Sequence, residues 1–225
     1  MTFAEAFVKT RESWLAIGLV LLALALTLPA SAQVLYENGP INGETDGWTI
    51  NDGFVVNNSF TISTGNSTIN GISFGAWLFP GDLLESVEVL ISSEPFGGTR
   101  YFDGVVNLTQ SNCNENGYGF EVCNETGSFS GPTLGNETYW LSLSNGVVNT
   151  GDPVYWDENS GIGCHSEGCP SEACGGTCIG SIPSEAFSLL GSSSGASSVP
   201  EPGSLGLVGT GLFAIVETLR RRFYL

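Results

Sequence analysis

Hydrophobic and polar residues alternate with a period of two through much of the chain. Val87, Val89 and Ile91 alternate with their neighbours, and similar alternation covers Tyr118–Val122 and Tyr139–Ser144. Side chains of a strand point to opposite faces in turn, so this pattern predicts strands with one buried face. Segments rich in Gly, Asn, Pro and Asp lie between them and predict turns. Further predicted strands cover 47–50, 54–63, 69–79, 101–109, 127–131 and 154–156.

These elements predict an all-β fold. About nine short strands in roughly 150 residues favour an antiparallel β-sandwich, jelly-roll-like, with a closed barrel as the alternative. No repeat of 20–50 residues is present, which argues against a propeller or a β-helix. We expect the sandwich to span residues 33–190, and the Gly/Ser-rich stretch 191–198 to be a flexible linker.

The first residues have the pattern of an export signal. Two basic residues precede an apolar run from Trp14 to Leu28, and the run is followed by Ala-Ser-Ala, which ends at Ala32. Small residues at these positions are typical of signal peptidase sites, so 1–32 is predicted to be a signal peptide with a helical core. Cleavage after Ala32 would leave Gln33 as the first mature residue. The alternative is an uncleaved membrane helix.

The charge of the exported part excludes some classes of binding partner. The chain has a formal net charge of −17, and all but four of its 23 acidic residues lie between the signal and the tail. Binding to a phosphate backbone requires clustered Lys and Arg, so nucleic acid is excluded as a partner. The same charge repels anionic lipid surfaces. The six basic residues are Lys9, Arg11, Arg100, Arg220, Arg221 and Arg222.

The cysteines all follow the signal peptide. An even number of cysteines in an exported protein predicts disulfides. Cys113 and Cys123 flank a turn and are expected to pair with each other, whereas three pairings remain open for the other four. A zinc site formed by those four with His165 is the alternative. The six cysteines are Cys113, Cys123, Cys164, Cys169, Cys174 and Cys178.

Catalytic patterns are scarce. His165 is the single histidine, and the chain contains no Gly-x-Ser-x-Gly, His-Glu-x-x-His or phosphate-binding loop. We therefore predict that the protein is not an enzyme. A secreted hydrolase that uses two facing carboxylates is the less favoured alternative.

The stretch GDPVYWDENSG suggests two kinds of binding site. Carboxylate and amide oxygens are ligands of Ca²⁺, so this loop is a candidate calcium site, with a self-bonded loop as the alternative. Aromatic rings form platforms for sugars, although on β-sandwiches such rings also form the core. The candidate calcium ligands are Asp152, Asp157, Glu158 and Asn159. The candidate sugar platform consists of Trp77, Trp140, Tyr155 and Trp156.

The C-terminal tail combines three parts: Pro200-Glu201-Pro202, an apolar segment from Leu205 to Leu219, and Arg220-Arg221-Arg222. A helix over the apolar segment would be about 22 Å long, which is short for a hydrocarbon core of about 30 Å. Apolar residues surround the segment almost completely, which is unlike an amphipathic helix packed on a domain. The arginines favour the cytoplasmic side of a membrane, with the acidic body outside.

The ordered combination of these three parts closely resembles the PEP-CTERM sorting tail. The resemblance covers roughly the last 27 residues. It implies that an exosortase, an integral-membrane enzyme, recognises Pro200, Glu201 and Pro202 and cuts nearby. It also implies a Gram-negative bacterium that makes exopolysaccharide or biofilm.

We therefore expect an exported protein at the cell surface or in the extracellular matrix, with a structural or adhesive role. Before processing, its C-terminal segment would hold it in the inner membrane. The alternative function is that of a carbohydrate-binding module for exopolysaccharide.

Overall fold

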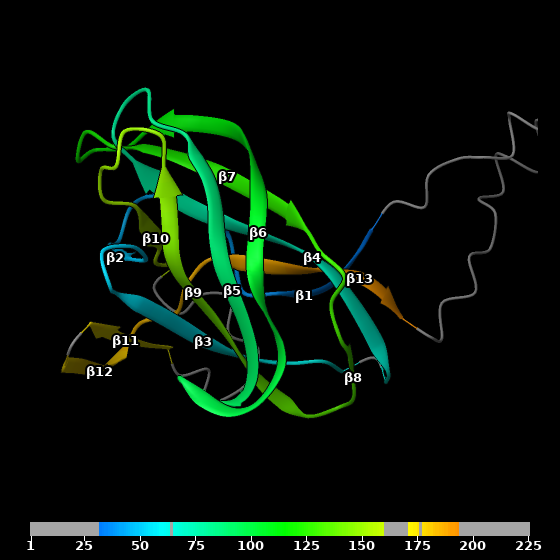
Figure 1. Ribbon diagram of the computed structural model, residues 1–225. Helices are drawn as coiled ribbons and strands as arrows, with labels where there is room; N and C mark the ends of the chain where they lie inside the picture. The colour runs from blue at the N-terminus through cyan, green and yellow to red at the C-terminus, as the bar shows by residue number, and fades with distance from the viewer. Residues whose placement is uncertain (1–31, 64, 160–170, 176, 194–225) are drawn as a thin grey trace, which may run out of the picture. The chain divides into compact units, whose positions relative to one another are not determined.

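The computed structural model describes residues 32–63, 65–159, 171–175 and 177–193 (Figure 1). Within these ranges it contains strands and no helix, so the predicted all-β class is confirmed. The strands are β1 (Gln33–Glu37), β2 (Gly47–Thr49), β3 (Val55–Thr61), β4 (Ser67–Leu78), β5 (Leu84–Glu94), β6 (Gly97–Glu115), β7 (Glu121–Ser128), β8 (Thr133–Leu134), β9 (Thr138–Val148), β10 (Tyr155–Asp157), β11 (Ser171–Gly175), β12 (Thr177–Ile182) and β13 (Phe187–Ser193).

The strands form one continuous antiparallel sheet rather than two separate ones. The order is β1-β13-β4-β7-β6-β5-β9-β3-β11-β12, with β8, β10 and β2 attached on the β4 side. β6 joins the two halves because it is 19 residues long. Its first part pairs with β5, as in Ile91 with Phe102, and its last part pairs with β7, as in Glu115 with Glu121. The jelly-roll-like sandwich is thus corrected to a curled half-barrel (Figure 1).

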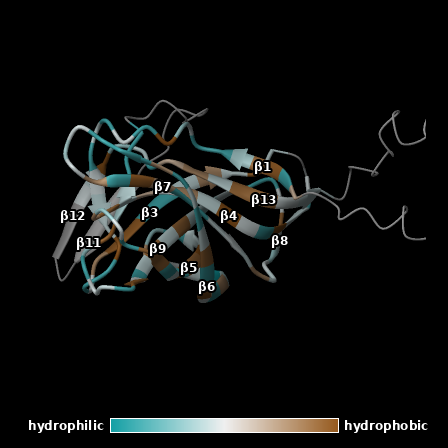
Figure 2. Cartoon of the chain, turned by 90° about the horizontal axis from the view of Figure 1, so that it is seen from above, coloured by the Kyte–Doolittle hydropathy of each residue, from teal (hydrophilic) through white to brown (hydrophobic). Residues whose placement is uncertain are grey.

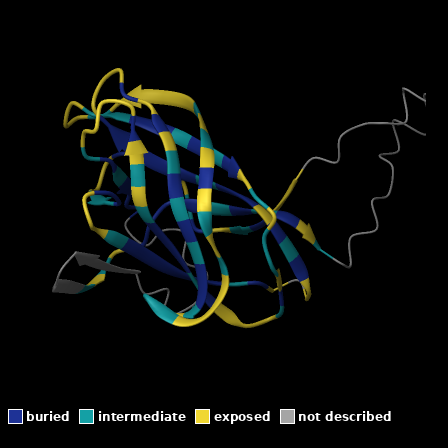
Figure 3. Ribbon diagram, viewed as in Figure 1, coloured by how far each residue is buried: buried dark blue, intermediate teal, exposed yellow. Residues whose placement is uncertain are grey.

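The core lies inside the curl. Phe74 and Phe187 from one half and Phe60 and Leu141 from the other belong to a single cluster of buried residues. Apolar positions recur along the strands that enclose this cluster (Figure 2), and the buried positions follow them (Figure 3). Removal of this apolar surface from water is the main stabilising contribution that the curl provides.

The predicted alternation is confirmed where it was strongest. Val87, Val89 and Ile91 are fully buried on β5, and Leu141 and Leu143 are fully buried on β9. On β5 the residues between them, Glu88 and Leu90, are half-buried, as expected for a strand with one face in the core, whereas Ser142 between the two leucines of β9 is buried as well.

The described body begins and ends in neighbouring strands. The chain divides into units between Ala32 and Gln33, and apart from Ala32 the first unit lies outside the described residues. β1 begins at Gln33, the predicted first mature residue. β13, which pairs with β1 and β4, continues to Ser193. The first three residues of the predicted 191–198 linker therefore belong to the sheet.

Several predictions concern residues outside the described ranges. They are the signal helix, the apolar helix 205–219 with the sorting residues on either side of it, and a zinc site that includes Cys164, His165 and Cys169. In the part of the chain that the structure describes, no helix has the length and apolar character needed to span a bilayer.

Candidate functional site

Asp157, a predicted calcium ligand, is fully buried at the end of β10. Its carboxylate accepts hydrogen bonds from the amides of Asn42 (2.9 Å) and Gly43 (3.0 Å) and from Nε1 of Trp77 (2.6 Å). Burial raises the pKa of this carboxyl, while the three donors act in the opposite direction. Asp157 thereby fastens the β1–β2 loop (38–46) to β4.

The next two predicted ligands are also bonded to the protein. Glu158 accepts a hydrogen bond from Nε1 of Trp48 at 2.8 Å. Burial is the main cause that raises the pKa of Glu158. The Asn159 amide nitrogen donates to the carbonyls of Asn38 and Glu185. These contacts tie the β10 segment to both ends of the body.

Asp152, the fourth predicted ligand, is exposed in the connection from β9 to β10. Its carbonyl accepts a hydrogen bond from the Asn51 side chain at 3.0 Å. Within the described ranges, no group of three or more His, Cys, Asp or Glu side chains is arranged to hold a metal ion. The calcium site stays a prediction.

Only two of the four rings of the predicted sugar platform are direct strand partners. Trp156 is fully buried, and its Nε1 donates to the carbonyl of Ala186 at 3.0 Å. Trp140 lies half-buried on β9, opposite Ser59 and Ser92. Trp77 and Tyr155, in contrast, are direct partners on β4 and β10. Trp77 and Tyr155 are therefore the two predicted platform residues that lie together.

Trp77 and Tyr155 belong to an aromatic cluster that also contains Phe79, Tyr118 and Phe120. Tyr118 stacks on Trp77 with a centroid distance of 5.6 Å and an interplanar angle of 20°. Phe120 contacts Trp77, Phe79 and Tyr155 with centroid distances of 5.8, 5.1 and 5.5 Å. Tyr118 is 63% exposed whereas Trp77 is 5% exposed. The cluster therefore presents a tyrosine ring to solvent on a buried indole.

Tyr118 and Phe120 lie in a tight turn between β6 and β7, where the alternation had predicted a strand. The side-chain oxygen of Asn116 accepts hydrogen bonds from the amides of both residues, each at 3.0 Å. Asn side chains commonly bond to nearby backbone in this way, and the glycines beside Tyr118 suit a turn. Asn116 and these glycines were thus a signal that could have identified the turn from the sequence.

The predicted disulfide between Cys113 and Cys123 is confirmed, and it braces this turn. We refer to residues 112–124 as the β6–β7 tip. Near the other cysteines, the backbone register of β11 and β12 places Cys174 opposite Cys178. The pairing of those two with each other stays a prediction.

The β1–β2 loop packs against the β6–β7 tip. Gly43 has a φ of +63°, and a Cβ atom there would come within 2.6 Å of the Val122 side chain. Glycine permits both this conformation and this close approach. The Tyr118 hydroxyl donates to the carbonyl of Glu44 at 3.3 Å. The loop and the tip therefore form one surface.

Two pockets open on this surface. The aromatic pocket, about 330 Å³, is lined by Thr45, Asp46, Trp77, Tyr118 and Phe120. The asparagine pocket, about 340 Å³, is lined by Ile41, Asn42, Asn112, Asn114, Glu115, Asn116, Val122 and Asn124. Each lining contains a single carboxylate, whereas the hydrolase alternative expects a facing pair.

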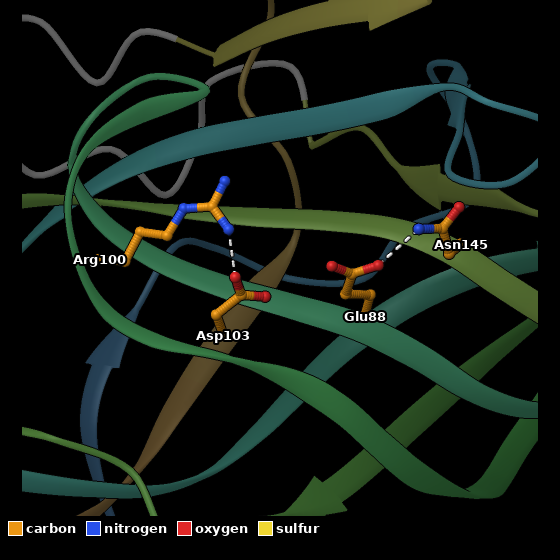
Figure 4. Close-up of polar contacts among 4 residues, drawn as sticks. All are labelled: Glu88, Arg100, Asp103 and Asn145. Carbon is orange, nitrogen blue, oxygen red and sulfur yellow. Dashed lines mark hydrogen bonds and ion pairs between the residues drawn. The ribbon is translucent and has the colours of Figure 1, made fainter.

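The charge near the pockets is negative. Glu44, Asp46, Glu115 and Glu121 all lie on or beside the loop and the tip. Arg100, the only Lys or Arg in the described part, lies near the opposite end of β6. There it forms an ion pair with Asp103, in the region where Asn145 donates to Glu88 (Figure 4). No basic side chain in the described part offsets the carboxylates at the pockets.

A further buried carboxyl lies in the sheet below the tip. Glu125 of β7 is fully buried, next to Phe74 and Gln110 in the strand register. Neither of its side-chain oxygens has a hydrogen-bond partner among the described residues. Desolvation raises its pKa from 4.5 to about 7. Because burial favours the neutral form of Glu125, we expect its ionisation to lower the stability of the fold.

The comparison with protein families finds the PEP-CTERM protein-sorting motif at residues 198–222. The resemblance of the tail is thereby confirmed, and the motif marks an exported protein that is sorted through its C-terminal signal. It also implies that an exosortase processes the chain. No curated protein and no solved structure matches the chain.

Proposed function

We propose that this chain is an exported cell-surface or extracellular-matrix protein with a structural or adhesive role. The observation that carries the proposal is the sorting motif at residues 198–222. The fold supports it in two ways. The body is a β-domain with a disulfide, which suits an oxidising compartment outside the cytosol, and the strongly negative net charge of the chain favours solubility there.

Processing has a physical basis in the tail. The apolar segment and the arginines would hold the unprocessed chain in the inner membrane, with the body outside. Pro200 and Pro202 are expected to favour an extended backbone that an enzyme can reach, because proline fixes φ and disfavours helix in the preceding residue. Exosortase would then release the body or transfer it to the cell surface.

Replacement of Pro200, Glu201 and Pro202 by alanine tests this route in the bacterium. We expect the variant to accumulate unprocessed in the membrane, as measured by intact mass and by cell fractionation. Glu94→Ala with Pro95→Ala is the matched control, because it removes the same residue types from the β5–β6 turn. An unchanged mass and location in the tail variant would overturn the proposed route.

A carbohydrate-binding module for exopolysaccharide is the second candidate, and the exposed Tyr118 ring stacked on Trp77 favours it. In this proposal the protein binds the glycan and is not an enzyme. A secreted hydrolase is the less favoured alternative. A calcium site near Asp157 is also retained as a proposal. A rise in melting temperature at millimolar calcium would support the calcium site, and an unchanged melting temperature would refute it.

A further inference from the structure

We infer that the surface formed by the β1–β2 loop and the β6–β7 tip binds a glycan of uncharged sugars. This inference rests on the carbohydrate-binding function proposed above, and it adds the location of the site and the class of ligand.

Tyr118 provides the platform. The residue is 63% exposed, and its ring stacks on Trp77 with a centroid distance of 5.6 Å. Trp77 is held in turn by the hydrogen bond from its Nε1 to Asp157. An aromatic ring has few rotatable bonds, so a supported ring loses little entropy when a ligand covers it. The apolar C–H face of a pyranose is a suitable partner for such a ring.

The asparagine pocket provides the polar contacts. Five of its eight lining residues are asparagines, whose amides both donate and accept hydrogen bonds, as sugar hydroxyls do. The Nδ2 atom of Asn116 is buried and has no hydrogen-bond partner among the described residues. A donor of this kind is costly to leave unpaired, so we expect a small movement of the Asn116 side chain to let a bound hydroxyl accept from it.

The same loop and the same tip contribute residues to both pockets, although no single residue lines both. Asn116 and Tyr118 are two residues apart, so their Cα atoms are separated by at most about 7 Å. This spacing lets one oligosaccharide stack on Tyr118 and place neighbouring hydroxyls among the asparagines.

The electrostatics select against acidic glycans. Glu44, Asp46, Glu115 and Glu121 surround the pockets, and Arg100 lies near the far end of β6. A polyuronate brought to this surface would place its carboxylates among like charges, which disfavours the complex. Uncharged sugars avoid this repulsion.

Isothermal titration of the full-length chain in detergent tests the inference. The uncharged probes are cellohexaose, laminarihexaose and mannohexaose, and hexagalacturonate is the acidic probe. We expect at least one uncharged hexamer to bind, and hexagalacturonate to bind about tenfold more weakly at low salt. Equal or tighter binding of hexagalacturonate would overturn the assigned class of ligand.

Two variants test the location, and a third is the control. Tyr118→Ala is expected to weaken binding about tenfold, and Asn114→Ala to weaken it severalfold. Tyr101→Ala is the matched control, because Tyr101 is also an exposed tyrosine but packs on Tyr139 near the start of β6. Its affinity is expected to stay within twofold of the native chain. Unchanged melting temperatures confirm that each variant is folded.

The outcomes distinguish a failure of the carbohydrate-binding function from a failure of the assigned site. If no hexamer binds the native chain, both this inference and the carbohydrate-binding function fail. If a hexamer binds equally well to the native chain and to Tyr118→Ala, the carbohydrate-binding function survives and the assigned site is wrong.

Discussion

The interior of the curl and the surface at the β6–β7 tip both contain clustered aromatic rings, but they use them differently. In the interior, Trp156 meets Phe74 and Phe187 edge to face at 6.2 and 5.6 Å and is fully buried. At the tip, Trp77 is nearly buried, yet it supports an exposed Tyr118. Aromatic rings in the interior of the curl stabilise the fold. At the β6–β7 tip, a nearly buried ring instead supports a ring that is open to solvent.

The indole N–H groups show the same contrast. Trp156 donates to the backbone carbonyl of Ala186, the residue before β13, so its hydrogen bond joins β10 to the segment that leads into β13. Trp77 donates to the carboxylate of Asp157, which also accepts the amides of Asn42 and Gly43. Hydrogen bonds to a charged group are about twice as strong as neutral ones. Asp157 therefore sets the position of the tip surface relative to the core.

The largest effect is expected from Trp156→Ala. Removal of a fully buried indole leaves a cavity beside Phe74 and Phe187, and it should cost about 3–5 kcal/mol of unfolding free energy. Urea unfolding followed by circular dichroism measures this loss. Tyr101→Ala, at an exposed position, serves as the control. A loss below about 1 kcal/mol would show that Trp156 does not anchor the interior.

The next largest expected effect on stability is the ionisation of Glu125, and this effect depends on pH. Because its pKa is about 7 in the folded chain and 4.5 is its ordinary value, the unfolded chain loses this proton first as pH rises. Stability is therefore lost between about pH 4.5 and pH 7 and does not fall further above that range for this group. Ionisation at Glu125 should cost about 3 kcal/mol across this interval.

Glu125→Gln removes this titration and tests it directly. The difference in unfolding free energy between the variant and the native chain should change by about 3 kcal/mol in favour of the variant from pH 4 to pH 8. Glu37→Gln, on the exposed end of β1, is the control. A difference that is constant with pH would mean that Glu125 has an ordinary pKa and a partner.

A smaller effect on stability is expected when the disulfide of the tip is removed. Cys113→Ser with Cys123→Ser opens a loop with a sequence separation of 10 and should cost about 2 kcal/mol. Glycan affinity should fall as well, because the bond holds the turn that presents Tyr118. Thermal melting and the hexamer titration measure the two effects. Full affinity in this variant would show that the tip is positioned without the disulfide.

The sequence predicted the interior better than the tip. The two-residue spacing of Val87, Val89 and Ile91 predicted that all three face the core, and all three are fully buried. The last residues of β6 are polar, so no apolar pattern predicted that this strand continues to Glu115 and joins the two halves. The sandwich was expected from the number of short strands, and the polar end of β6 gave no sign that one strand would join both halves.

The aromatic surface was predicted in part. Trp77 and Tyr155 were included in the expected platform, and they do lie together. Trp156 occupies the core, the alternative that its large apolar ring had left open. The alternation pattern predicted a strand at Tyr118 and Phe120, because it does not register the hydrogen bonds that their amides donate to the Asn116 side chain in the turn. Contacts between distant segments, such as Asp157 with the β1–β2 loop, depend on tertiary structure and leave no local pattern.

Export and sorting are the central claim, and the intact mass of the protein recovered from the bacterium tests them most directly. The account predicts a chain that begins at Gln33 and lacks the segment from the Pro200–Pro202 region to Leu225, including its three arginines. A recovered chain that retains Arg220, Arg221 and Arg222 together with residues 1–32 would contradict it.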